Sequence, residues 1–295
     1  MNSRRPQLVH TIAELRQTLD AVRREGKSIG LVPTMGALHE GHLSLVRASK
    51  AECDYTVVTI FVNPSQFAAG EDLDAYPRTL EADLDALADC EAELVFAPAE
   101  SEVYPPGSDT TVEVGAVAEP LEGQFRPTHF RGVATIVLKL FNMAGADKAF
   151  FGQKDYQQAS VIRRMVADLD VPIEVRVCPI VREPDGLAMS SRNAYLSPAA
   201  RKRAVVLFQS LELARRLVAE GPRDATAIIG RMKETIAMAE DARIDYVALV
   251  DPDSLHSVDE VSAPTLAVLA VHIENTRLID NCILEPERDN SIMEP

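Results

Sequence analysis

Two histidines three residues apart, His39 and His42, are the side chains of this sequence best suited to chemistry. They follow an apolar run and a glycine-containing turn at the start of a helical pattern, where residues three apart share one face. A helix N-terminus carries free N–H groups and partial positive charge, so it favours phosphate. Gly41 between the histidines leaves room for a nucleotide. We therefore expect imidazoles that donate to phosphate oxygens during an in-line displacement, although two surface histidines capping a helix have the same spacing.

Other motifs for phosphate or metal chemistry do not fit the sequence. The segment 26–28 resembles the end of a phosphate-binding P-loop, but the required first glycine falls at Ala21 and a strand follows where a helix should. The two histidines are one residue too close for a zinc-binding H-E-x-x-H helix. The four cysteines lack paired spacing, which indicates reduced thiols and neither a disulfide frame nor a zinc site.

Composition limits the partners. The formal net charge is −15 and no block of Lys or Arg is present, so the surface disfavours nucleic acid. An anionic substrate must then be held by a few local cations in a cleft. Residues 1–10 lack a signal-peptide core, and the apolar stretch at 266–271 is far shorter than a membrane span. We expect a cytoplasmic protein without a membrane partner.

The N-terminal part of the chain alternates apolar runs with amphipathic patterns, which predicts a parallel sheet with right-handed crossovers. The expected strands are at residues 28–33, 55–62, 93–97, 148–151 and 173–181. The expected helices are at residues 12–24, 43–48, 81–88, 132–144 and 157–169. Ligands bind such sheets where the strands end, so one rim should hold the polar segments 34–42, 63–66 and 152–155.

A polar, Gly- and Pro-containing stretch at 183–193 divides the chain, and we expect domains over residues 1–182 and 183–295. The fold class is therefore α/β: a Rossmann-like parallel sheet domain with a smaller C-terminal α+β domain. At 295 residues, the chain is long enough for two domains or one large one.

The second domain begins with Ser197 and Pro198, which are typical of an N-cap and a first helical residue. One helical face continues through residues 204–218. The domain is completed by a helix and two strands, expected at residues 225–239, 244–250 and 266–273. The polar tail from Glu285 onward is expected to be mobile.

Taken together, five segments in order resemble the pantoate–β-alanine ligase family. They are Pro33 to His42, Phe61 to Phe67, Tyr76 to Thr79, Phe151 to Gln158 and Met189 to Asn193. The family belongs to the nucleotidylyl-transferase superfamily, which carries an H-x-G-H pair. The resemblance implies an enzyme that makes pantothenate from pantoate, β-alanine and ATP through a pantoyl-adenylate, releasing AMP and pyrophosphate. It also implies a homodimer.

The resemblance assigns two groups of residues to the reactants. Pantoate would contact Met35, Asn63, Gln66 and Gln158, and amides suit a substrate with hydroxyl groups. By itself, Asn63 before proline favours a simple turn. ATP would contact residues on both sides of the expected domain boundary: Met35, His39, His42, Gly152, Lys154, Asp155, Val181, Met189, Ser190, Ser191 and Arg192.

Within this set the resemblance makes His39, His42, Lys154 and Arg192 the catalytic residues. Lys154 follows an apolar strand and would neutralise phosphate, although a lone lysine there is usually solvent-facing. Asp155 would bind the ribose hydroxyls or cap the next helix. The segment 190–192 supplies several donors to phosphate, but its composition equally suits a polar linker. Mg²⁺ would bridge the phosphates and need few protein ligands.

Some points stay open. Gln153 stands where many family members have Glu, and Glu122 and Arg126 match a flexible loop in which β-alanine capture is only a guess. No residue is a compelling general base. The alternatives are another nucleotidyltransferase of the superfamily, which would not need the pantoate amides, and a non-catalytic nucleotide-binding protein. A tRNA synthetase fragment is disfavoured by the acidic charge.

Overall fold

The computed structural model describes residues 5–68, 70–221 and 223–286. The chain divides into two compact units, Met1–Val181 and Arg182–Pro295, and each is described by itself. The polar tail from residue 287 onward lies outside the described residues. Among the described helices, none combines the length and apolar character needed to cross a membrane.

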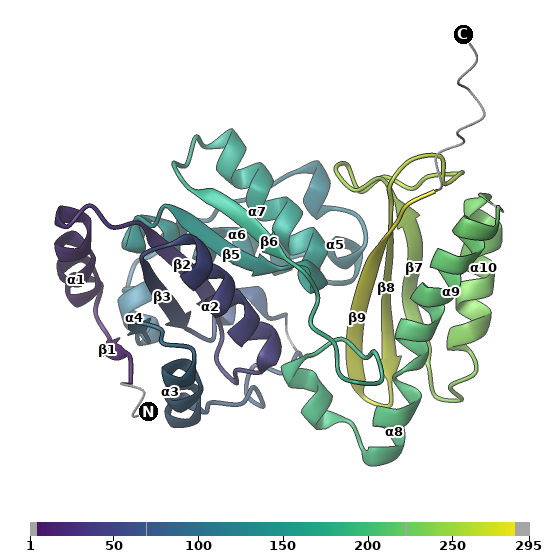
Figure 1. Cartoon of the computed structure of the whole chain (residues 1–295), viewed down its shortest axis with the longest axis horizontal. Coiled ribbons are helices and arrows are strands. Elements are labelled where there is room, and N and C mark those ends of the chain that lie inside the picture. The colour runs from purple at the N-terminus through teal and green to yellow at the C-terminus, as the bar shows by residue number, and fades with distance from the viewer. Residues whose placement is uncertain (1–4, 69, 222, 287–295) are drawn as a thin grey trace, which may run out of the picture. The chain divides into compact units, whose positions relative to one another are not determined.

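The first unit contains a six-stranded parallel sheet in the order β1-β4-β3-β2-β5-β6 (Figure 1). Its central strand β2 pairs with β3 on one side and β5 on the other, so the direction of winding reverses beside β2. Ligands of open parallel sheets bind at this switch point, beyond the strand ends. The strands are β1 (Gln7–Val9), β2 (Ile29–Thr34), β3 (Tyr55–Ile60), β4 (Leu94–Phe96), β5 (Lys148–Gly152) and β6 (Glu174–Cys178).

Alternate strand residues bury the two faces of this sheet against different helices. Leu31 and Val57 lie in one core with α1, α6 and α7, whereas their neighbours Val32 and Val58 lie in another with α2 and α3. All four are fully buried, which stabilises the fold by about 1.5–3 kcal/mol each. The helices are α1 (Ile12–Arg24), α2 (Glu40–Glu52), α3 (Leu80–Asp89), α4 (Glu100–Val103), α5 (Glu122–Phe125), α6 (His129–Ala144) and α7 (Tyr156–Asp168).

Two glycines allow a close approach between neighbouring elements of the first unit. A Cβ on Gly30 of β2 would lie 2.1 Å from the Ser49 hydroxyl of α2. A Cβ on Gly132 of α6 would lie 2.2 Å from the carbonyl oxygen of Ser65, in the short 3₁₀ turn η1 (Pro64–Gln66). Helix α6 therefore supports the polar turn that follows β3.

The second unit is an antiparallel sheet, β7-β8-β9, packed against two helices (Figure 1). Ser197 caps its first helix through the N–H of Ala200. The elements are α8 (Pro198–Arg203), α9 (Val206–Glu220), α10 (Ala225–Ile236), β7 (Arg243–Val250), β8 (Thr265–Ile273) and β9 (Thr276–Leu284).

The predicted fold class is confirmed, but three details of the prediction were wrong. The helix expected to run through residue 218 breaks between α8 and α9, and strands β1 and β9 were not expected. In β9 the apolar pattern is interrupted by Asp280, which is 2% exposed because Arg182 neutralises it through two hydrogen bonds of 2.6 and 2.9 Å. Strand β9 was therefore missed because the partner of Asp280 is distant in sequence.

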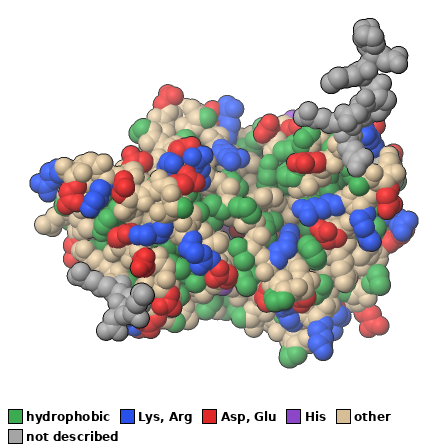
Figure 2. All heavy atoms as spheres, viewed as in Figure 1, with side chains coloured by type: hydrophobic (Ala, Val, Ile, Leu, Met, Phe, Trp, Pro, Cys, Tyr) green, Lys and Arg blue, Asp and Glu red, His purple; other side chains and the backbone are tan. Residues whose placement is uncertain are grey.

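Acidic and basic side chains are intermingled on the visible face of each unit (Figure 2). Several of them form ion pairs between neighbouring elements. Glu52 at the end of α2 accepts from Lys148 of β5 at 2.8 Å and from Arg176 of β6 at 2.9 Å. Such exposed pairs contribute little to stability, because solvent screens their charges.

Candidate active site

The loop between β2 and α2 is held in a compact left-handed turn. Gly36 and Ala37 have φ of 82° and 51°. The Thr34 hydroxyl accepts the Gly36 N–H at 3.2 Å and donates to the Thr59 carbonyl at 2.7 Å, which ties the loop to β3. The chain then enters α2 with His39 as its N-cap residue.

His39 and His42 lie against each other at this helix start, with ring centroids 4.1 Å apart and an interplanar angle of 32°. The Nδ1 atom of His39 accepts the N–H of Gly41 at 3.1 Å, and Nδ1 of His42 accepts the N–H of His39 at 3.4 Å. An imidazole whose Nδ1 accepts carries its proton on Nε2 when neutral. Both rings are thus set as Nε2–H donors at a helix N-terminus.

Burial lowers the pKa of His42 from 6.5 to about 3, and the neighbouring His39 and the Lys154 ammonium act in the same direction. His42 is therefore neutral near pH 7. A neutral imidazole can donate one hydrogen bond to a phosphate oxygen without the cost of a buried charge.

Lys154 and Asp155 follow β5, the strand beside β2, in the 3₁₀ turn η3 (Gln153–Asp155). The Lys154 ammonium lies 3.8 Å from the Asp155 carboxylate, and the side chains are 21% and 46% exposed. Asp155 is the N-cap residue of α7, yet its side chain makes no capping hydrogen bond among the described residues. A Cβ added to Gly152 would meet nothing within 4 Å, so the strand end is open.

Asn63 is buried at 1% exposure, and its side chain is fully hydrogen-bonded. Its Nδ2 donates to Gln66 Oε1 at 3.1 Å and to the Gly132 carbonyl at 3.3 Å. Its Oδ1 accepts from the Tyr104 hydroxyl at 2.8 Å and from the Ser65 hydroxyl at 3.0 Å. All four hydrogen-bonding positions of the amide are used, so Asn63 orients Gln66.

Gln66 joins two loops of the rim. Its Nε2 lies 3.0 Å from the sulfur of Met35, which brings the loops after β2 and β3 together. On α7, the adjacent residues Gln157 and Gln158 differ. Gln157 is buried and bonds three backbone groups between residues 117 and 122, whereas Gln158 is partly buried with no side-chain hydrogen bond within the described ranges.

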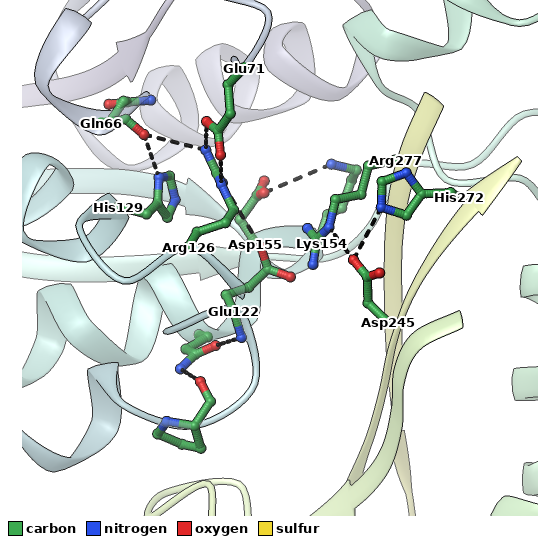
Figure 3. A network of polar contacts seen from close by, with 12 residues as sticks. Gln66, Glu71, Glu122, Arg126, His129, Lys154, Asp155, Asp245, His272 and Arg277 are labelled. Carbon is green, nitrogen blue, oxygen red and sulfur yellow. Dashed lines mark hydrogen bonds and ion pairs between the residues drawn. The ribbon is translucent and has the colours of Figure 1, made fainter. Parts of the chain in front are cut away.

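Arg126 and His129 both contact the backbone carbonyl oxygen of Gln66 (Figure 3). Arg126 Nη2 and His129 Nδ1 approach its carbonyl oxygen at 3.3 and 2.9 Å. Glu71 binds the Arg126 guanidinium through two hydrogen bonds of 2.7 Å. Burial, followed by the charge of Arg126, lowers the pKa of His129 to about 4, so neutral His129 donates from Nδ1.

A part for Arg126 in β-alanine capture stays a prediction, and the structure shows which groups its side chain contacts. The guanidinium is engaged with Glu71 and Gln66, and Glu122 lies 3.9 Å from it. Burial opposes ionisation of Glu71, but the hydrogen bonds and charge of Arg126 outweigh it and lower the pKa of that carboxyl. The ion pair is partly buried, at 16% and 23% side-chain exposure, and it frames Gln66.

The run Met189 to Arg192 lies in the second unit. Ser190 is the N-cap of the 3₁₀ helix η4 (Ser191–Tyr195), and its hydroxyl accepts the Arg192 N–H at 3.2 Å. Asn193 Nδ2 donates to the Ala188 carbonyl at 3.1 Å, which closes the turn. The last three residues of the run, from Ser190 to Arg192, are partly buried.

A family model described as pantoate–β-alanine ligase matches residues 7–283. The chain belongs to the pantoate–β-alanine ligase family. The pantothenate synthetase of Roseiflexus sp. (strain RS-1) is 54% identical over 278 residues, covering 94% of this chain and 99% of the relative. That of Moorella thermoacetica is 50% identical over 279 residues, covering 95% and 99%.

Solved structures agree. The pantothenate synthetase of Thermus thermophilus is 43% identical with a TM-score of 0.91, covering 95% of this chain and 100% of the other. A pantoate–β-alanine ligase of Francisella tularensis, in complex with βγ ATP and β-alanine, is 32% identical with a TM-score of 0.79, covering 94% and 97%. The family resemblance is confirmed, and this ligase is an enzyme that forms a carbon–nitrogen bond.

The predicted site residues of this ligase divide between its two units. In the first unit, the segments at the carboxyl ends of β2, β3 and β5 carry Met35, His39, His42, Asn63, Gln66, Gly152, Lys154 and Asp155, with Gln158 on α7. Val181 ends this unit, and the run from Met189 to Arg192 belongs to the other. The closure of that run over ATP remains a prediction.

Some residues that support the site were missed in the sequence, Tyr104 and His129 among them. Tyr104 orients Asn63 from the loop after α4, and His129 holds Gln66 from the start of α6. A histidine at the start of a predicted helix is a weak signal for His129. No local pattern in the sequence marks Tyr104, because its partner is 41 residues away.

Proposed function

We propose that this ligase condenses pantoate with β-alanine in two steps at the carboxyl ends of β2, β3 and β5. The observation that carries the proposal is the His39–His42 pair, set as Nε2–H donors at the start of α2, with Lys154 at the end of the neighbouring strand β5. This pair lies at the switch point of a parallel sheet, where nucleotides bind in related folds.

ATP would lie with its phosphates against the histidines, with the Met35 backbone beside them. Lys154 would neutralise phosphate charge, and Asp155, whose carboxylate is 46% exposed, would bind the ribose hydroxyls. Gly152 would let the nucleotide approach β5. ATP would also contact Val181 at the end of the first unit and four residues of the second unit: Met189, Ser190, Ser191 and Arg192.

In the first step, a pantoate carboxylate oxygen attacks the α-phosphorus of ATP and pyrophosphate leaves with the electrons of the broken P–O bond. Negative charge shifts toward the bridging oxygen as that bond breaks. Neutral His42 can donate its Nε2–H to an oxygen on which this charge develops, and Lys154 and Arg192 add positive charge. Because these donors are already oriented, little reorganisation accompanies the step.

Pantoate would be held by the amides of Gln66 and Gln158. The Gln66 side chain is fixed by Asn63 and its backbone by Arg126 and His129, so Asn63 acts by orienting it. In the second step the unprotonated amine of β-alanine attacks the adenylate carbonyl carbon, AMP leaves and the amine loses a proton to solvent. Catalysis then rests mainly on positioning.

Mg²⁺ fits this site through the phosphates. Within the described parts of the chain, no group of three or more His, Cys, Asp or Glu side chains could hold a metal ion. The ion would be bound by phosphate oxygens and water, as Mg²⁺ commonly is. When bound, it offsets phosphate charge and favours departure of pyrophosphate.

Three further features belong to the proposal. The second unit would act as a lid that brings Ser190, Ser191 and Arg192 to ATP. The ligase would work as a homodimer, as the family resemblance implies, and light scattering at working concentration would test this. It would act in the cytoplasm, where ATP is available, and cell fractionation would test that.

Exchange of labelled pyrophosphate into ATP tests the proposed function. Without β-alanine, exchange should depend on an added hydroxy acid and be fastest with pantoate across a panel of related acids. With β-alanine added, AMP and pantothenate should form in equal amounts. Absence of pantoate-dependent exchange, or a product that retains the nucleotide, would overturn the proposal.

A further inference from the structure

The turn that leads to the histidines is held from behind by a buried carboxylate that the proposed reaction does not use. Asp83 lies in the first turn of α3 and is 3% exposed. Its Oδ2 accepts the Ala37 N–H at 3.1 Å, and its Oδ1 accepts the Leu38 N–H at 2.8 Å. The carboxylate therefore bonds two successive backbone groups from 45 residues away in sequence.

These bonds hold a backbone conformation that is unfavourable by itself. Ala37 has a φ of 51°, a left-handed conformation that residues with a side chain rarely adopt. Gly36 before it has a φ of 82°, and a Cβ there would lie 3.1 Å from Asp83 Oδ2. The turn thus persists because Asp83 satisfies both of its inward N–H groups.

Asp83 is itself oriented by the segment before α3. The Thr79 hydroxyl donates to Oδ1 at 3.2 Å. Thr79 ends the Tyr76 to Thr79 segment, which is part of the family resemblance but has no role in the proposed chemistry. The contact with Asp83 gives Thr79 a structural role.

The backbone held by Asp83 continues directly into the catalytic pair. Leu38 precedes His39, whose own N–H is accepted by His42 Nδ1 and whose ring accepts from Gly41. A shift at Leu38 would move both contacts and turn both Nε2–H groups. Since a misplacement of about 1 Å can cost roughly 10²-fold in rate, this support matters for catalysis.

We propose that Asp83 is a positioning residue that sets the orientation of His39 and His42 through the backbone of Ala37 and Leu38. The inference rests on the proposed function, because it assigns Asp83 to the adenylation step. It also limits how phosphate is bound. The N–H groups of Ala37 and Leu38 are occupied by Asp83, so they are not the donors to ATP.

The main test is Asp83→Asn, which keeps the shape but leaves one oxygen for two N–H donors. We expect the rate of pantoate-dependent pyrophosphate exchange to fall about 10- to 100-fold, with the ATP KM within about 3-fold of wild type. Asp85→Asn is the matched control, since this exposed carboxylate on the same helix pairs with Arg5. It should retain wild-type rates.

A double-mutant cycle separates positioning from a general effect on the fold. In a His42→Ala background, Asp83→Asn should cost less than it does in wild type, because one of the two rings that it orients is gone. An equal fold-loss in both backgrounds would overturn the proposal, as would an Asp83→Asn enzyme with a wild-type rate. No exchange in the wild-type enzyme would instead refute the proposed function.

A milder variant covers the case in which Asp83→Asn does not fold. Thr79→Val keeps the carboxylate and removes only the hydroxyl that orients it. We expect a loss of about 2- to 5-fold in exchange rate, which should again shrink in the His42→Ala background. Thr79→Val with unchanged rate and unchanged melting temperature would also count against the proposal.

Discussion

Replacing His42 with asparagine should make this ligase more resistant to acid. In the folded protein, burial and nearby positive charge lower the pKa of His42 to about 3, compared with 6.5 ordinarily. Between these pH values the unfolded chain binds a proton that the folded chain does not. The contribution of neutral His42 to the free energy of unfolding is therefore fully present above about pH 6.5 and is lost as the pH falls toward 3.

The size of the effect follows from the difference between the two pKa values. Each pKa unit corresponds to 1.36 kcal/mol. At about pH 5 the folded His42 is still neutral, while the pH lies about 1.5 units below the pKa of His42 in the unfolded chain. The free energy of unfolding of the wild type is therefore about 2 kcal/mol lower than at pH 7.5. His42→Asn removes this loss, so the variant should gain about 2 kcal/mol on the wild type over this interval.

The assay is urea unfolding followed by circular dichroism, without nucleotide, at about pH 7.5 and pH 5. The curves should be fitted to two transitions, because the chain forms two compact units. His129→Asn is a positive control, since a pKa of about 4 gives a similar shift. Ser44→Ala, in the same helix as His42, changes no titrating group. A His42→Asn stability difference that is the same at both pH values would refute the assigned pKa.

Three kinetic predictions concern the site. His42→Ala should lower kcat for adenylation about 10²- to 10³-fold with a melting temperature near wild type, and a large stability loss with intact turnover would contradict this. Lys154→Ala should lower kcat by about 10²-fold, while Gln153→Glu should be nearly silent and Gln153→Ala mild. Equal damage from Gln153→Ala and Lys154→Ala in steady-state assays would show that the amide acts in the site. Arg126→Gln should raise the KM for pantoate about 10-fold by loosening Gln66. A rise confined to the KM for β-alanine would instead indicate β-alanine capture.

Much of the fold could be predicted because the core strands of the first unit are uninterrupted apolar runs. The helix at 12–24 was predicted at its observed bounds, where Thr11 and Glu14 form a capping box. Strand β9 was missed because Asp280 and Asn281 are buried in it, and their partners cannot be read from local pattern. A strand that buries an ion pair, as β9 does, thus cannot be predicted from its local apolar pattern.

The site was predicted less completely than the fold. Motif residues such as His39 and Lys154 stand out by type and position. Asn63 was expected among the pantoate residues, but whether its amide binds substrate or another side chain depends on Tyr104 and Gly132, which are distant in sequence. Asp83 was not singled out, since a carboxylate in a predicted helix is normally exposed.

The fate of labelled oxygen from pantoate tests formation of a pantoyl-adenylate most directly. If the carboxylate attacks the α-phosphorus, pantoate labelled with ¹⁸O in its carboxylate should transfer one label to AMP during synthesis of pantothenate. Mass spectrometry of AMP, pyrophosphate and phosphate from one reaction would locate it. Among these products, AMP alone should carry the label. Label in pyrophosphate or phosphate, with none in AMP, would contradict a pantoyl-adenylate.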